Sequence, residues 1–147
     1  MKFPSKIHWH PFSVHFPSVF YPFSVFLLIL YLVFGNEDLE KLSLYSLWAG
    51  AVTNLFAIVT GFVDWEKRYR ANLVPIFMQK IALSLITLEI SSVCLCWHYF
   101  QPDILLNNSN PDLATADAFK YIYIGLVLTL APAIGHAGHL GGKLIHN

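Results

Sequence analysis

The sequence predicts an all-α integral membrane protein, a bundle of four transmembrane helices. Of its 147 residues, 56% are hydrophobic and only 12% are charged, whereas an ordinary soluble domain carries about 25% charged residues. Four apolar stretches each approach the roughly 20 residues that a helix needs to cross a bilayer core. Polar segments separate these stretches, so we expect residues 1–147 to form a single domain of four spans.

The predicted spans cover approximately residues 17–34, 44–63, 76–99 and 119–142. The first ends in the Gly-Asn-Glu-Asp sequence that starts at Gly35, and the charged segment 64–72 ends the second. Segment 102–117 holds two prolines and three asparagines, which indicates a loop between the third and fourth spans.

The distribution of Lys and Arg predicts the orientation, because such residues accumulate on the cytoplasmic side of membrane proteins. Lys41 and Lys120 fall on one side of the four-span arrangement. Six others fall on the opposite side: Lys2, Lys6, Lys67, Arg68, Arg70 and Lys143. We therefore expect both termini to be cytoplasmic, and a bacterial inner membrane as the location.

Six of the seven histidines lie near one predicted membrane face. They precede or open the first span (His8, His10, His15) or follow one another at the end of the fourth (His136, His139, His146). His98, at the far end of the third span, is the exception. Because the first and fourth spans run antiparallel, the sequence predicts that the two groups of histidines converge.

The end of the fourth span strengthens this hypothesis. His136, His139 and His146 are spaced by 3 and 7 residues, so they share one helical face. Small residues interleave with them and would let a helix or flat ligand approach: Gly135, Gly138, Gly141 and Gly142. Pro132, one turn earlier, is expected to kink the helix.

Neutral imidazole is a good ligand for iron, zinc and copper, and axial histidines from facing helices can hold haem iron. We therefore expect a b-type haem near the cytoplasmic surface, with His15 and His139 as first-choice metal ligands and His10, His136 and His146 as alternates. Binding of zinc or copper in place of haem is a weaker alternative. The alternative interpretation is that the histidines hydrogen-bond to carbonyls, water or lipid headgroups at the membrane interface.

Three segments together resemble the DUF2231 family of predicted four-helix membrane proteins. They are His10-Pro11-Phe12-Ser13-Val14-His15-Phe16-Pro17, Thr60-Gly61-Phe62-Val63-Asp64 and His139-Leu140-Gly141-Gly142-Lys143-Leu144-Ile145-His146. The family's pattern is HPxxVHFP, TGxxD and HxGGxLxH, and the matching positions are His10, His15, Asp64, His139, Gly141, Gly142 and His146. The resemblance implies a redox-associated membrane protein.

The sequence departs from this family pattern at the start of the third span. A histidine is usual there, whereas this chain has Met78-Gln79-Lys80. Either one ligand site is lost, or Met78 serves as a soft axial ligand in its place.

Polar residues inside the spans are a second group of candidates. Glu89 lies near the middle of the third span. Placing a carboxyl group in the hydrocarbon region costs free energy, so its presence there suggests a function. The simpler expectation is that Glu89 hydrogen-bonds to Asn54 or Thr129 and joins helices; the alternative is a role in proton transfer or quinol binding. Asp64 is expected either to fix the tautomer of a ligand histidine or to pair with Lys67 or Arg68.

Two functions follow from these residues. The first is a haem b electron-transfer protein or subunit of a redox complex, whose partners are the lipid bilayer, other membrane subunits and a quinone. The second is an accessory subunit of a larger assembly, in which the histidines contact lipid, pigment or neighbouring chains. No phosphate-binding loop, nucleophile motif or zinc-protease motif supports an independent enzyme, and a net charge of zero does not suggest nucleic-acid binding.

Overall fold

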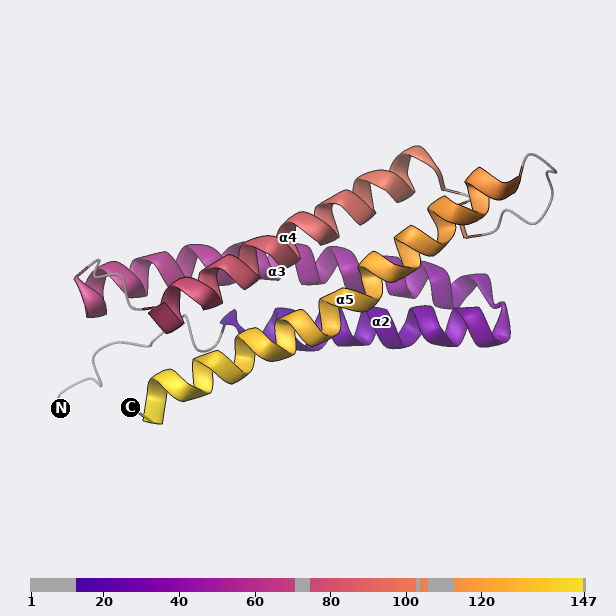
Figure 1. Cartoon of the computed structure of the whole chain (residues 1–147). Coiled ribbons are helices and arrows are strands. Elements are labelled where there is room, and N and C mark those ends of the chain that lie inside the picture. The colour runs from indigo at the N-terminus through magenta and orange to yellow at the C-terminus, as the bar shows by residue number, and fades with distance from the viewer. Residues whose placement is uncertain (1–12, 71–74, 103, 106–112, 147) are drawn as a thin grey trace.

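The computed structural model describes residues 13–70, 75–102, 104–105 and 113–146, and within these ranges it does not describe the side chains of 68, 69, 113–117 and 141–146. Four helices account for nearly all of this part of the chain (Figure 1). They are α2 (His15–Phe34), α3 (Glu37–Tyr69), α4 (Pro75–Phe100) and α5 (Leu113–His146).

Each of the four helices is long and apolar enough to cross a membrane. The predicted fold class, an all-α membrane four-helix bundle, is therefore confirmed. The helices contain the four predicted spans and extend past them, most of all in α3 and α5. The extension has a simple cause: an α-helix satisfies its backbone hydrogen bonds internally, so it does not have to end where the apolar stretch ends.

The turn between α2 and α3 is short because each helix carries its own cap. Gly35 ends α2 with a φ of 66°, a left-handed conformation that glycine adopts at low cost, and its N–H donates to the Tyr31 carbonyl at 2.8 Å. Asn36 then begins α3, since its side-chain oxygen accepts a hydrogen bond from the Asp38 N–H at 2.9 Å. The predicted Gly-Asn-Glu-Asp loop is thus only two residues long.

Small residues hold α2 and α3 close together. The Ser24 hydroxyl donates to the Ser43 carbonyl at 2.9 Å, and the Ser43 hydroxyl donates back to the Ser24 carbonyl at 2.8 Å. Ser46 donates to the Phe20 carbonyl at 2.9 Å. In lipid, where apolar burial does not drive helices together, such close packing and interhelical hydrogen bonds supply the attraction.

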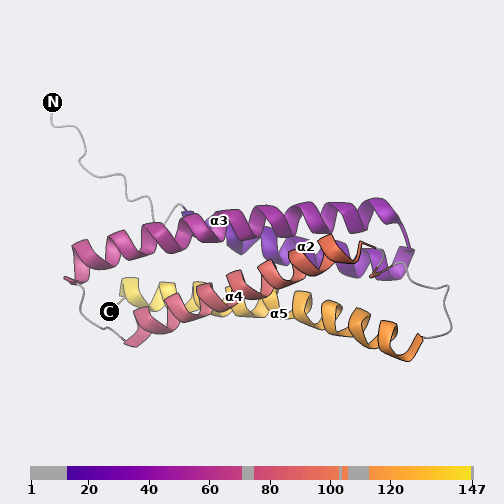
Figure 2. The same cartoon turned by 90° about the horizontal axis from the view of Figure 1, so that it is seen from above.

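The bundle is arranged so that each helix packs on two others: α2 on α3, α3 on α4, α4 on α5 and α5 on α2. Figures 1 and 2 show α2 and α3 lying side by side, with α4 and α5 oblique to them. The centre is filled by side chains that are almost completely buried, including Tyr21, Leu28, Leu47, Val127 and Leu130.

The start of α2 and the end of α5 lie at the same end of the bundle (Figure 1). This follows from four consecutive antiparallel crossings, and it places the opening residue His15 at the same end of the molecule as the last turns of α5.

Candidate functional site

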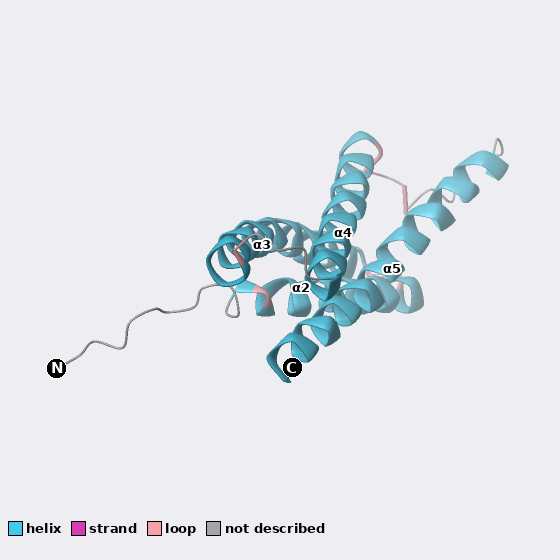
Figure 3. Cartoon of the chain, turned by 60° about the vertical axis from the view of Figure 1, so that its left-hand side comes forward, coloured by secondary structure: helices cyan, strands magenta, loops and turns pink. Residues whose placement is uncertain are grey.

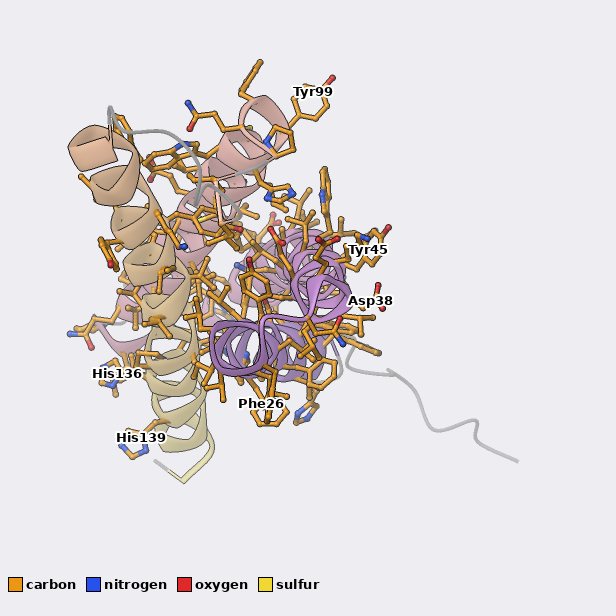
Figure 4. The ribbon with its side chains drawn as sticks, turned by 90° about the vertical axis from the view of Figure 1, so that its right-hand side faces the viewer. Phe26, Asp38, Tyr45, Tyr99, His136 and His139 are labelled. Carbon is orange, nitrogen blue, oxygen red and sulfur yellow. The ribbon has the colours of Figure 1, made fainter. Side chains whose placement is uncertain are left out.

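The histidines of α5 lie on an exposed face of that helix. His136 and His139 are both exposed, and their ring centroids are 6.5 Å apart with 33° between the ring planes. Figure 4 shows both side chains pointing away from the other helices. The buried face of the same segment consists of Ile134, Ala137 and Leu140, so the core contacts of this segment are made by apolar side chains.

The described glycines between these histidines also face outward. Gly135 and Gly138 are exposed, and a Cβ atom added to either would meet no heavy atom within 4 Å. They are therefore not needed for packing among the residues that the structure describes. We call the surface formed by Gly135, His136, Gly138 and His139 the α5 glycine–histidine face.

His15 does not join the α5 histidines. It is exposed at the first position of α2, and in the part of the chain that the structure describes no hydrogen bond or ring contact links it to His136 or His139. The inward positions of α2 are occupied instead by residues such as Pro17 and Tyr21. Among the described histidines, His15, His136 and His139 thus lie at the same end of the bundle without contacting one another across α2 and α5.

Several predicted ligands lie partly or wholly outside the described structure. His10 falls within residues 1–12 and is not described. Gly141, Gly142 and His146 belong to α5 by their backbone, but their side-chain surroundings are not described. Within the described ranges, no three His, Cys, Asp or Glu side chains are grouped closely enough to hold a metal ion.

The described residues fit a haem only on the outside of the bundle. The central space is filled by packed side chains, whereas His136 and His139 are accessible. His136 and His139 are neighbours on one helix face, so either imidazole would be able to hold a haem iron from outside the bundle. Any further ligand would have to come from outside the α5 glycine–histidine face. Met78, the alternative soft ligand, is 41% exposed on α4.

Asp64 has a charged neighbour on another helix that the sequence pattern did not indicate. It lies half-buried near the end of α3 and interacts electrostatically with Lys80, near the start of α4. The sequence suggested a ligand histidine or the nearby Lys67 or Arg68 instead. Lys80 was missed because a pairing between two helices depends on their register, although a lysine in the first turns of an apolar span is itself a signal.

Asn54 is the centre of a buried polar network between α2, α3 and α4. Only 1% exposed, it directs its side-chain N–H groups at the Ser84 carbonyl (3.0 Å), the Thr87 hydroxyl (3.1 Å) and the Tyr21 hydroxyl (3.4 Å). Tyr21 in turn hydrogen-bonds Ser91 at 3.0 Å. The Asn54 Oδ1 atom is buried and accepts no hydrogen bond from the described residues.

Glu89 and Thr129 are not part of this network, contrary to the simpler expectation. Both are exposed, and the Thr129 hydroxyl donates to the carbonyl of Leu126 in its own helix at 2.7 Å. Helical geometry explains the position of Glu89. Thr87 faces Asn54, and a residue two positions later is rotated by about 200°, so Glu89 points away from the core.

A comparison with known families identifies a family that covers nearly the whole chain. The family described as "Predicted membrane protein (DUF2231)" matches residues 6–147 of the chain. This range includes all four helices and the α5 glycine–histidine face. No curated protein and no solved structure matches the chain.

Proposed function

The chain belongs to the DUF2231 family of predicted membrane proteins, and on this premise we propose that it is an accessory subunit of a larger membrane assembly. The α5 glycine–histidine face carries the proposal. Its polar side chains and open glycines are directed away from the chain's own core. Nearly all described residues belong to the four helices, so the surface they offer suits contact between membrane helices.

The chemistry of this face favours a protein partner over lipid. Glycine lets another helix backbone approach closely, and histidine can hydrogen-bond across a helix interface. Within the described residues, the candidate span of α5 runs from Ala118 to Leu140, and it includes His136 and His139. A partner at this depth would shield the imidazoles from the hydrocarbon region.

Adding bulk to this face tests the proposal. The Gly138→Leu variant should fold normally, because a Cβ there meets no atom of the described residues within 4 Å, but should not enter the large complex on native gel electrophoresis of mildly solubilised host membranes. Gly125→Leu is the matched control, since Gly125 is equally open on the same helix. Loss of the complex in both variants, or in neither, would contradict the assignment of this face.

A second candidate function, electron transfer through a b-type haem, is favoured by one specific observation. Two accessible imidazoles, with ring centroids 6.5 Å apart, flank a glycine with open space above it. A bound haem would supply a one-electron redox centre. His136 or His139 would hold the iron through an imidazole nitrogen, Gly138 would leave room for the haem beside the helix, and a partner would supply any further ligand.

An oxidised-minus-reduced visible spectrum of the purified complex separates the two functions. A sharp α-band of the b type that disappears in His139→Ala or His136→Ala, but persists in His98→Ala, would establish haem ligation by α5. A spectrum without this band from an intact complex would refute electron transfer through haem and leave the accessory role.

A further inference from the structure

We propose that two copies of this chain pair in parallel through the outer face of α4, with their Glu89 carboxyl groups hydrogen-bonded to each other near the middle of the membrane. This surface is separate from the α5 glycine–histidine face and does not depend on the function proposed above. Three observations carry it: the depth of Glu89, the spacing of the exposed residues on α4, and the self-complementary chemistry of a carboxyl group.

The depth of Glu89 follows from the polar network. Thr87, two residues earlier, hydrogen-bonds Asn54, which lies close to the midpoint of α3 (Glu37–Tyr69). With a rise of about 1.5 Å per residue, Glu89 is displaced from Thr87 by only about 3 Å along the helix axis. Among the acidic residues of the described spans, Glu89 alone lies away from the helix ends.

The side chain of Glu89 has no partner among the residues that the structure describes. It is exposed, and within the described ranges no hydrogen bond or ion pair involves it. α4 packs on α3 and α5, and Figure 3 shows its remaining side bordered by no other helix of the bundle. A carboxyl group facing hydrocarbon is costly, and such groups in membrane proteins nearly always meet a partner.

The exposed residues of α4 form a continuous seam. Their spacing alternates between four and three residues, which is the heptad pattern of two helices packing along their length. The seam consists of Met78, Ala82, Leu85, Glu89, Ser92 and Cys96. Ala82 and Ser92, on either side of Glu89, are small enough for two backbones to approach closely.

A second copy is the occupant that this seam fits best. Two copies inserted with the same orientation and related by a two-fold axis along the membrane normal place each residue opposite itself at the same depth. Glu89 therefore meets Glu89 without any adjustment. A carboxyl pair that shares a proton offers both a donor and an acceptor, so each group satisfies the other.

Cross-linking through Cys96 tests this pairing. Cys96 is exposed and lies one heptad beyond Glu89 on the same seam, whereas Cys94 is buried. In lipid vesicles containing the purified full-length chain, copper phenanthroline should produce a disulfide-linked species of twice the chain mass from the Cys94→Ala variant. The Cys96→Ala variant should give none.

Substitution of Glu89 then tests the hydrogen bond itself. Glu89→Leu should weaken dimerisation by at least about fivefold, as measured by cross-linking yield over a series of lipid dilutions. Glu89→Gln should preserve it, because an amide also donates and accepts. Thr129→Leu, a polar-to-apolar change at an exposed position on α5, is the matched control and should have no effect.

Two results would overturn the proposal. One is a failure of the predicted dimer: the Cys96 cross-link does not form. The same conclusion follows if the cross-linking yield at high lipid dilution is equal with and without the Glu89→Leu substitution. The other is a conjugate in native membranes whose mass is not twice that of the chain, which would assign the α4 seam to a different subunit.

Discussion

Asn54 shows how a single polar side chain can connect three helices inside a membrane protein. Its amide reaches α4 through Ser84 and Thr87 and reaches α2 through Tyr21. In the sequence it is one asparagine in an apolar stretch. Hydrocarbon offers no competing hydrogen bonds, so these contacts favour one register of the helices over others shifted along the axis.

Replacing Asn54 with Leu should destabilise the protein by about 1–2 kcal/mol, because three interhelical contacts are lost while the branched shape of the side chain is kept. The midpoint of SDS-induced unfolding in mixed micelles measures this change. Thr53→Val is the control, since the Thr53 hydroxyl bonds only to carbonyls of its own helix, Ala49 and Gly50. An unchanged or raised midpoint for Asn54→Leu would mean that the unsatisfied Oδ1 costs more than the contacts contribute.

At the scale of helices, α2 and α3 make a tight contact at Gly50. Gly50 lies beneath the Tyr21 ring, and a Cβ added there would be 2.8 Å from Cδ1 and 2.9 Å from Cε1. Tyr21 is completely buried and is also held by Ser91, so the ring cannot move aside. The two helices can therefore lie this close together only because Gly50 has no side chain.

The Gly50→Ala variant should lose about 1–3 kcal/mol of stability because the overpacked contact forces α2 and α3 apart. Thermal unfolding in detergent, followed by the loss of the monodisperse peak on size-exclusion chromatography, detects this. Gly125→Ala introduces the same methyl group where no atom lies within 4 Å, and alanine favours helix over glycine. It should be neutral or stabilising; equal losses in both variants would exclude a packing cause.

At the scale of the whole molecule, the four crossings return the chain to its starting side of the membrane. The start of α2 and the end of α5 lie at one end (Figure 1), and this end also carries Lys67 and Arg70. The excess of positive charge predicts that this side is cytoplasmic.

Reporter fusions test the orientation. Alkaline phosphatase, which is active only outside the bacterial cytoplasm, should be inactive when fused after Asn147 and active when fused after Asn110, between α4 and α5. The positive-inside preference predicts this pattern. The reverse pattern would place both termini outside and would also move the α5 glycine–histidine face to the opposite membrane surface.

The sequence by itself determined the class of the protein, the number of helices and the end of the molecule at which the histidines gather. These features depend on length and hydrophobicity: four apolar stretches must become helices in a bilayer, and an even number of crossings brings both ends together. The motifs around His15, Asp64 and His139 likewise identified the family. Each can be recognised from a few consecutive residues, and the three occur in a fixed order along the chain.

Only the tertiary structure decided which side of each helix faces inward. Glu89 and Asn54 are both polar residues in the middle of a span, yet Asn54 is buried in a network and Glu89 is exposed. His136 and His139 likewise share a helix face with glycines, but that face points outward. The physical reason is that lipid tails and a protein core are equally apolar. Hydrophobicity along the chain therefore cannot distinguish the two environments, and close packing between helices determines the rotation of each one.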